Sequence, residues 1–89
     1  MKRMRIKVNG DVQGVFYRYY AKREAKRVGI NGWVRNIEDG SVEALIEGED
    51  EAVKNFIRWS SKGSPMATVE DVETSEENYT GELGKFEVR

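Results

Sequence analysis

At 89 residues with a formal net charge of −1, the chain is long enough for one modest hydrophobic core and too short for a second. It contains no cysteine and no histidine, which excludes disulfides, thiolate catalysis and zinc–sulfur sites and removes the commonest proton-transfer side chain. Any chemistry must rely on carboxylates, arginine, lysine, amides, hydroxyls and backbone groups, which favours charge stabilisation and positioning. With no targeting signal and no apolar run near the roughly 20 residues of a membrane span, we expect a soluble, cytoplasmic protein with one domain over residues 1–89.

The near-neutral net charge hides an uneven distribution along the chain. Residues 1–35 hold ten Lys or Arg against only Asp11 and Glu24, whereas the remaining residues hold five basic and fourteen acidic side chains. A basic half of this kind steers anionic ligands toward a site. It also fits the solvated faces of one strand and one helix that pair with acidic neighbours in the fold, and we favour this second interpretation.

The first third of the sequence predicts a strand, a loop and a helix. In residues 3–9 apolar side chains alternate with Arg and Lys, which is typical of a strand with one buried face. A glycine-containing loop follows, and a helix is expected from about Tyr17 to Val28. One face of this helix carries Tyr17, Ala21, Ala25 and Val28. Gly29 suits its C-terminal cap, where a left-handed conformation costs glycine nothing.

Two strands joined by a tight turn are predicted in the middle of the chain. Residues 30–37 form the first, and residues 42–48 alternate in the manner of the second. The turn between them is Glu38-Asp39-Gly40, because Asp-Gly supplies the positive-φ geometry of a hairpin.

A second helix and two further strands complete the chain. Asp50 is the expected N-cap of a helix that ends near Lys62. Its inner face carries Val53, Phe56, Ile57 and Ser60. A fourth strand is expected over residues 67–74, a polar loop over 75–83 and a short final strand over 85–89. The order βαββαβ, with this extra strand, predicts a ferredoxin-like α+β sandwich in which an antiparallel sheet carries both helices on one face.

The loop before the first helix is the first candidate site. Gly10 and Gly14 permit a turn whose backbone N–H groups lie beside the positive end of a helix, and this arrangement forms a concave anion-binding site. Arg18, in the first helical turn, supplies a guanidinium fork for phosphate or carboxylate oxygens. These residues alone leave a second interpretation open, namely an ordinary strand-to-helix turn with Arg18 on a solvated face.

Asn36, at the end of the second strand, is the second candidate. In a ferredoxin-like sandwich the first and second strands lie near each other, so that this residue approaches the loop after the first strand. Its side-chain amide offers two donors and an acceptor, which suits it to hold a water molecule in line with a bound phosphoryl group. From its position alone, the simpler interpretation is a turn residue before a hairpin.

Two stretches of the sequence resemble the signature stretches of the acylphosphatase family. They are Gly10-x-Val12-Gln13-Gly14-Val15-x-x-Arg18 and Gly32-Trp33-Val34-x-Asn36-x-x-Asp39-Gly40-x-Val42-Glu43. The resemblance continues through Glu47-Gly48 and the Gly63-x-Pro65 turn and covers essentially the whole chain. Two motifs at the correct mutual distance are far more specific than a single glycine loop.

This resemblance implies an enzyme that hydrolyses the carboxyl–phosphate anhydride of acyl phosphates to a carboxylate and inorganic phosphate, without a metal or a cofactor. By motif position, Arg18 is the catalytic arginine that binds phosphate, and Asn36 orients the attacking water. The implied phosphate cradle consists of the main-chain amides of Gln13, Gly14, Val15, Phe16, Tyr17 and Arg18. The expected partners are the acyl phosphate and inorganic phosphate, with neither nucleic acid nor membrane, and we expect a monomer.

Two positions depart from the family pattern, and two others have an expected place near the site. Tyr17 stands where the family usually has phenylalanine, and its hydroxyl needs a partner or water. Asp11 places a carboxylate on the loop, although alternation along the strand indicates that it points away. Trp33 is expected in the core or in a wall near the site. The family also suggests that the terminal carboxylate at Arg89 approaches Arg18.

Two other functions compete with the enzyme. Ferredoxin-like sandwiches also bind RNA, and the basic half fits a nucleic-acid backbone, but Met4, Ile6 and Val8 are aliphatic where base-stacking aromatics are expected. The second is a sensing domain that binds acyl or carbamoyl phosphate without turnover. A free-standing chain with both Arg18 and Asn36 favours the enzyme.

Overall fold

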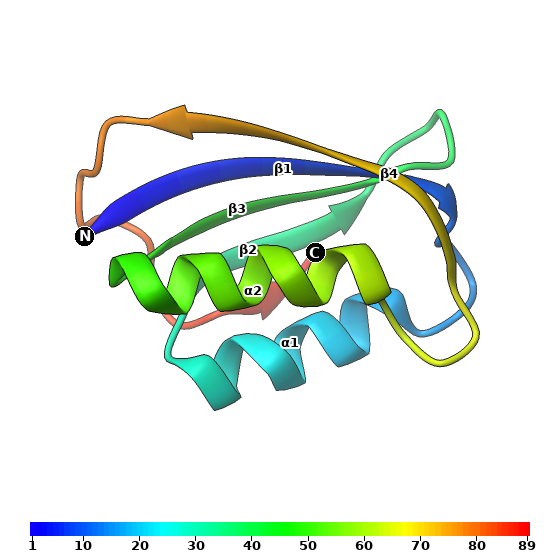
Figure 1. Ribbon diagram of the computed structural model, residues 1–89, viewed down its shortest axis with the longest axis horizontal. Coiled ribbons are helices and arrows are strands. Elements are labelled where there is room, and N and C mark those ends of the chain that lie inside the picture. The colour runs from blue at the N-terminus through cyan, green and yellow to red at the C-terminus, as the bar shows by residue number, and fades with distance from the viewer.

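Two α-helices pack against one face of a five-stranded β-sheet in the computed structural model, which describes residues 1–89 (Figure 1). The elements follow in the order β1 (Lys2–Asp11), α1 (Tyr17–Val28), β2 (Asn31–Asn36), β3 (Val42–Gly48), α2 (Asp50–Lys62), β4 (Thr68–Glu77) and β5 (Glu87–Val88). This is the predicted order of elements, and the predicted ferredoxin-like α+β class is confirmed. Neither helix is long and apolar enough to cross a membrane.

The strand order in the sheet is β4-β1-β3-β2-β5. Strands β1 and β2 are each antiparallel to β3, which lies between them, so the two strands expected near each other are second neighbours that run in the same direction. The loop after β1 and the end of β2 therefore lie at the same end of the sheet. Strand β5 pairs parallel with β2, which makes the sheet mixed at this edge instead of purely antiparallel.

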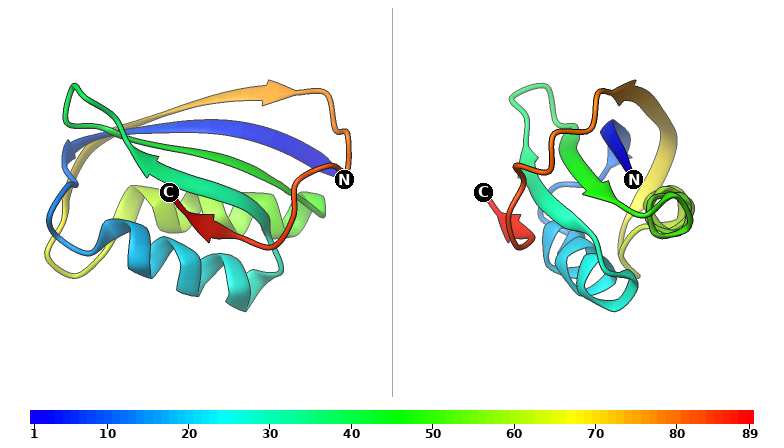
Figure 2. Two further views of the ribbon diagram at one scale, coloured as in Figure 1. Left: turned by 180° about the vertical axis from the view of Figure 1, so that it is seen from behind. Right: turned by 90° about the vertical axis from the view of Figure 1, so that its left-hand side faces the viewer.

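The core lies between the sheet and the helices (Figure 2). Alternation in β1 turns Ile6 and Val8 inward, and both are almost fully buried. The predicted helical faces are confirmed, because the buried residues are Tyr17, Ala21 and Ala25 in α1 and Val53, Phe56 and Ser60 in α2. Val28 and Ile57, predicted on the same faces, are only partly buried at the rim of this core.

Several predicted bounds differ from the structure. Strand β1 covers Lys2–Asp11 instead of residues 3–9, and β2 covers Asn31–Asn36 instead of residues 30–37. Helix α2 begins at Asp50, and Glu49 occupies the N-cap position without a side-chain hydrogen bond. Strand β4 continues to Glu77 through part of the predicted polar loop, because its last residues pair with β1. The Glu77 carboxylate contacts Arg3 and Arg5 there instead of a hydrophobic layer. Strand β5 is limited to Glu87–Val88, and Lys85 forms only an isolated bridge with Asn31.

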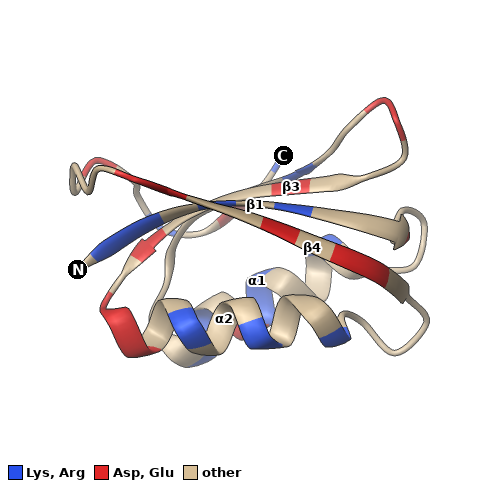
Figure 3. Ribbon diagram, turned by 45° about the horizontal axis from the view of Figure 1, so that its top comes forward, with Lys and Arg blue, Asp and Glu red and all other residues tan.

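The face of the sheet opposite the helices carries a network of ion pairs. Figure 3 shows Lys and Arg segments of β1 beside Asp and Glu segments of β3 and β4. The Nη1 atom of Arg3 lies 3.2 Å from Oε2 of Glu47, and Nε of Arg5 lies 2.7 Å from Oε2 of Glu77. The Nζ atom of Lys7 lies 3.0 Å from Oδ2 of Asp39 in the β2–β3 turn. For Arg3, Arg5 and Lys7, the favoured interpretation of the basic half is confirmed.

Glu47 is the buried member of this network, with a side chain that is 3% exposed. Its carboxylate accepts hydrogen bonds from the main-chain N–H groups of Thr80, Gly81 and Leu83 at 3.0–3.2 Å. Burial by itself would raise the pKa of Glu47, but these N–H groups and Arg3 outweigh it and lower the pKa to about 2. The carboxylate thereby fixes the segment that leads from β4 to β5.

Candidate active site

The loop of residues 12–16 connects β1 to α1 through two left-handed backbone conformations. Gly14 has φ 74°, a conformation that glycine adopts without a steric penalty. Phe16 has φ 64° and ψ 22° at the N-cap position of α1, although it is not glycine. A bulky residue in this conformation costs about 1 kcal/mol or more. The surrounding structure therefore holds the chain in a shape that an ordinary helix start does not need.

This shape leaves the amides of the loop without partners. None of the main-chain N–H groups of residues 13–18 donates a hydrogen bond within the chain, and the first N–H of α1 that does so belongs to Tyr20. The first turn of α1 carries no acidic side chain, whereas the first turn of α2 carries Asp50 and Glu51. Unpaired amides at the positive end of a helix bind anions. The predicted anion site is thus available in the structure.

The side chain of Gln13 ties the loop to the β2–β3 turn. Its Nε2 atom donates to the main-chain oxygens of Ile37 at 2.7 Å and of Ser41 at 2.9 Å. The turn itself is closed by a hydrogen bond from the N–H of Gly40 to the oxygen of Ile37, as the predicted Asp-Gly hairpin requires. Sequence reasoning assigned Gln13 only a main-chain role, and no sequence signal reveals where a glutamine side chain in a loop will point.

Two further hydrogen bonds hold the other side of the loop. Ser64 is buried, and its Oγ donates to the main-chain oxygen of Val15 at 2.7 Å. The hydroxyl of Tyr17 donates to the main-chain oxygen of Ser60 at 2.9 Å, which is the partner that its burial requires. Burial raises the pKa of the Tyr17 hydroxyl, so it stays a neutral donor. Ser64 was not singled out from the sequence, and its only signal is its place inside the Gly63-x-Pro65 turn.

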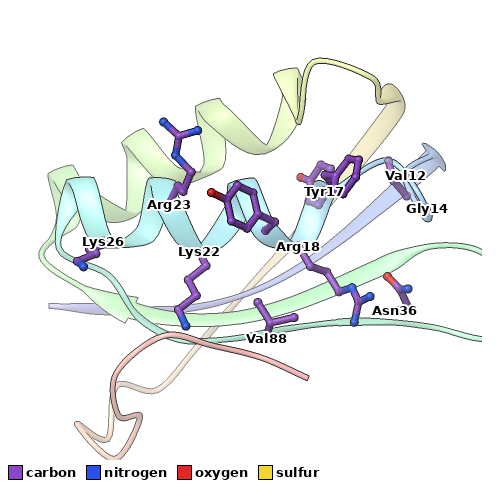
Figure 4. Close-up of a pocket in the computed structure, with 11 residues that line it drawn as sticks. Val12, Gly14, Tyr17, Arg18, Lys22, Arg23, Lys26, Asn36 and Val88 are labelled. Atoms are coloured by element: carbon purple, nitrogen blue, oxygen red, sulfur yellow. The ribbon is translucent and has the colours of Figure 1, made fainter.

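Arg18 and Asn36 line one cavity of about 680 Å³ together with Gly14. Figure 4 shows the Arg18 guanidinium extending from α1 toward the side chain of Asn36 at the end of β2. The Nη1 atom of Arg18 donates to the main-chain oxygen of Arg89 at 2.8 Å, so the last residue does approach this arginine. Val88 forms the neighbouring part of the cavity wall.

The cavity is cationic. Four basic residues line it, no acidic residue does, and these cations are Arg18, Lys22, Arg23 and Lys26. Asp11 is exposed and does not line the cavity, in agreement with the direction expected from strand alternation. No group of three or more Asp or Glu side chains is placed to hold a metal ion.

The predicted residues do not all reach this cavity. Phe16 and Tyr17 line it with Gly14 and Arg18, whereas the side chains of Gln13 and Val15 do not. These two residues keep only their unpaired main-chain N–H groups as candidates for anion contact.

Trp33 is buried, as the first of its two expected positions requires, and it does not line the cavity. It is 8% exposed and alternates with the core residue Val34, so that it lies on the sheet face away from the helices. The guanidinium groups of Arg35 and Arg89 cover its ring at 5.3 and 4.9 Å from the centroid. It belongs to neither the core cluster nor the cavity wall.

The fold and the cavity define a small ferredoxin-like domain with a cationic cavity at the end of its first strand. Residues 4–88 match the acylphosphatase family model. The chain is 51% identical to an acylphosphatase of Rubrobacter xylanophilus, over 99% of this chain and 80% of that protein, and 49% identical to one of an Anaeromyxobacter species, over 100% and 96%. It superposes on the crystal structure of an acylphosphatase from Bacillus subtilis with a TM-score of 0.96 at 37% identity, covering 100% and 99% of the two chains.

The chain therefore belongs to the acylphosphatase family. It is an enzyme, a hydrolase of acyl phosphates that yields inorganic phosphate. The predicted family and activity are confirmed.

Proposed function

We propose that this acylphosphatase captures the phosphoryl group of its substrate on the amides of residues 13–18 and on Arg18, and that Asn36 directs the attacking water. The observation that carries this proposal is the set of unpaired N–H groups at residues 13–18, beside a cavity that Arg18 and Asn36 share. These donors are fixed before substrate arrives, so the protein does not reorganise as charge develops. No Asp or Glu side chain lines the cavity to neutralise these donors.

In the proposed reaction, the water oxygen forms a bond to phosphorus as the bond from phosphorus to the acyl oxygen breaks. The leaving group departs as a carboxylate and needs no proton, because a carboxylic acid is ionised at neutral pH. Catalysis then consists of positioning and of neutralising the equatorial phosphoryl oxygens. Amides of the loop and the Arg18 fork supply that neutralisation.

Asn36 holds the water in line in this mechanism. Its amide accepts a hydrogen bond from the water through Oδ1 and donates one to a phosphoryl oxygen or to the water through Nδ2. The cavity wall offers no histidine and no carboxylate as a general base. A phosphoryl oxygen of the substrate therefore takes the proton released by the water.

Hydrolysis of benzoyl phosphate, followed with a chelator present, tests these roles. We expect Asn36→Ala to lower kcat at least about 100-fold while the inhibition constant of inorganic phosphate changes little, because the amides and Arg18 still hold the anion. Arg18→Ala should lower kcat and also weaken the binding of inorganic phosphate. Arg58→Ala, which removes an exposed arginine of α2, is the matched control. An equal loss of turnover and phosphate affinity in Asn36→Ala would contradict the assigned role.

We propose further that residues 1–89 act as one catalytic unit, as a cytoplasmic monomer that needs neither cofactor, membrane nor nucleic acid. The support is that one chain provides the loop amides, Arg18 and Asn36 of the same cavity. Light scattering during gel filtration should then give a mass near 10.2 kDa at the concentrations that show full specific activity. Activity that falls on dilution, with loss of a larger species, would contradict the monomer.

A further inference from the structure

A row of cations extends the anion site along α1. Arg18, Lys22 and Lys26 follow one another at intervals of four residues and line the same cavity. Neither lysine forms a salt bridge with an Asp or Glu side chain, in contrast to Arg27 of the same helix, which pairs with Glu24. The mechanism proposed above uses only the first cation of the row. The lysines are therefore available to a second anionic group.

The spacing of the row sets the distance between two such anions. Residues four apart on a helix are neighbours about 6 Å apart on its surface. Figure 4 shows the side chains of Arg18 and Lys22 leaving α1 toward the C-terminal segment at Val88, whereas Arg23 leaves on the opposite side. Tyr19 and Val88 contribute apolar surface to the same cavity. A ligand that lies along this wall would meet a cation, a short apolar surface and then a second cation.

We propose that Lys22 is a specificity-determining residue, and that the preferred substrates are acyl phosphates whose acyl group ends in a second anionic group. This inference rests on the proposed function, because the phosphoryl group must lie at Arg18. An extended chain advances about 1.2 Å per bond. Five bonds, as between the phosphorus and the far carboxyl carbon of a four-carbon diacid, therefore span about 6 Å. The far carboxylate or phosphate of such a substrate then reaches the ammonium of Lys22.

The expected size of this preference follows from the exposure of Lys22. An ion pair in contact with solvent contributes a factor of about two to five. Lys26 lies one turn further and adds to the attraction of a dianionic substrate rather than to the contact itself. We therefore expect a preference of about threefold from Lys22.

Succinyl monophosphate and butyryl phosphate form the test pair, since they share a four-carbon acyl chain and differ in the far carboxylate. We expect the wild-type kcat/KM to be about threefold higher for succinyl phosphate, and Lys22→Gln to bring the ratio close to one. Lys54→Gln on α2 removes the same charge from an exposed position outside this cavity and should leave the ratio unchanged. Circular dichroism establishes that each variant is folded.

Two outcomes would overturn the assignment of Lys22. One is a ratio near one in the wild-type protein, and the other is a preference that survives Lys22→Gln. A failure of the proposed function looks different, because Arg18→Ala and Asn36→Ala would then hydrolyse butyryl phosphate as fast as the wild type, whatever the succinyl-to-butyryl ratio. Equal losses of preference in Lys22→Gln and Lys54→Gln would show a general charge effect and would also remove Lys22 from its role.

Discussion

Two groups of basic residues, one on the sheet and one on α1, have opposite surroundings. The sheet cluster (Arg3, Arg5 and Lys7 of β1) has acidic residues of β3 and β4 on either side (Figure 3). Each member forms a salt bridge, and that of Lys7 is with Asp39 in the β2–β3 turn. The helix cluster (Arg18, Lys22, Arg23 and Lys26) forms no salt bridge with an Asp or Glu side chain and lines a cavity instead. The same residue types thus stabilise the fold in one place and remain available to an anion in the other.

The difference arises from the secondary structure that presents each cluster. A β-strand inside a sheet has neighbours on both sides. Arg3 therefore meets Glu47 and Glu77 directly across. Arg5 reaches Glu43 and Glu77 diagonally, since Leu45 and Ser75 lie opposite it. A helix at the surface presents its polar face to solvent. Only Glu24 is acidic in α1, and it pairs with Arg27 on the next turn. No Asp or Glu side chain therefore compensates the positive charge near the loop, where Arg18 donates to the main-chain oxygen of Arg89.

Replacement of Arg18 by lysine should give the largest effect, because it keeps the charge of the helix cluster and removes the guanidinium fork. We expect kcat/KM for benzoyl phosphate to fall about 1,000-fold, since a lysine cannot bind two phosphoryl oxygens at once. The free energy of unfolding should change by less than about 0.5 kcal/mol, since Arg18 lies at the surface of α1. Arg35→Lys, at an exposed position outside the cavity, is the control. A loss below tenfold would mean that charge alone suffices.

Glu47→Gln tests the opposite cluster and should affect stability instead of turnover. The neutral amide keeps one acceptor but turns its NH₂ group toward N–H donors that the carboxylate now satisfies. We expect the free energy of unfolding in urea to fall by about 3 kcal/mol, with kcat per folded molecule unchanged. Glu76→Gln, an exposed β4 residue without a salt bridge, is the control. A turnover defect that exceeds the folding defect would link the two clusters.

The same residue determines how stability depends on pH. Because the folded pKa of Glu47 is about 2 and its ordinary value is 4.5, its stabilising effect is complete above about pH 5 and is lost as the pH falls through this window. Hydrogen bonds from Arg5 and Arg3 lower the pKa of Glu77 as well, so its contribution has the same sign. Between pH 6 and 2, the free energy of unfolding should therefore fall more steeply with decreasing pH in the wild type than in Glu47→Gln. Parallel curves would exclude Glu47 as the source.

Local sequence patterns predicted the helices and strands. The features that these patterns did not predict depend on pairing between strands that are distant in the sequence. The bounds of α1 and β3 were predicted to the residue, because apolar periodicity and Gly29 mark them without reference to other elements. The end of β4 was missed because Glu76 and Glu77 read as loop residues until β1 supplies their partners. The burial of Glu47 was missed for the same reason.

The residues of the candidate site also fall into those that local sequence patterns predicted and those that they did not. Gly14, Arg18 and Asn36 were found because glycine, arginine and asparagine have particular uses at a turn and at an anion site, and the family resemblance supplied their expected roles. Gln13 and Ser64 hold the loop through side-chain contacts with main-chain oxygens that lie 24 to 49 residues away in the sequence. Such contacts depend on where the backbone places a carbonyl, and a single sequence does not encode that locally.

Gln13→Leu should have an intermediate effect, because Gln13 connects the loop to the β2–β3 turn that follows Asn36. The replacement removes two hydrogen bonds, yet the oxygens of Ile37 and Ser41 keep main-chain partners. We expect kcat to fall about tenfold through misplacement of the loop amides relative to Asn36, with a loss of stability of about 1 kcal/mol. Gln13→Glu should be worse, since a carboxylate would face two carbonyl oxygens. Unchanged kcat in both variants would show that the loop holds its shape without this link.

Salt should give the smallest effect and separates the two clusters without changing the fold. Raising NaCl from about 0.05 M to about 0.5 M shortens the Debye length to a few ångströms. We expect kcat/KM for succinyl phosphate to fall about threefold, because the exposed Lys22 and Lys26 attract the substrate through water. The free energy of unfolding should change by less than about 0.5 kcal/mol, since the half-buried pairs of the sheet cluster are screened less. In the double variant Lys22→Gln/Lys26→Gln, the fall should be shallower. Chloride competes at Arg18 in both proteins, so the difference between their dependences of kcat/KM on NaCl reports the lysines alone. If kcat/KM falls equally in both proteins, the whole salt effect belongs to Arg18 and the loop.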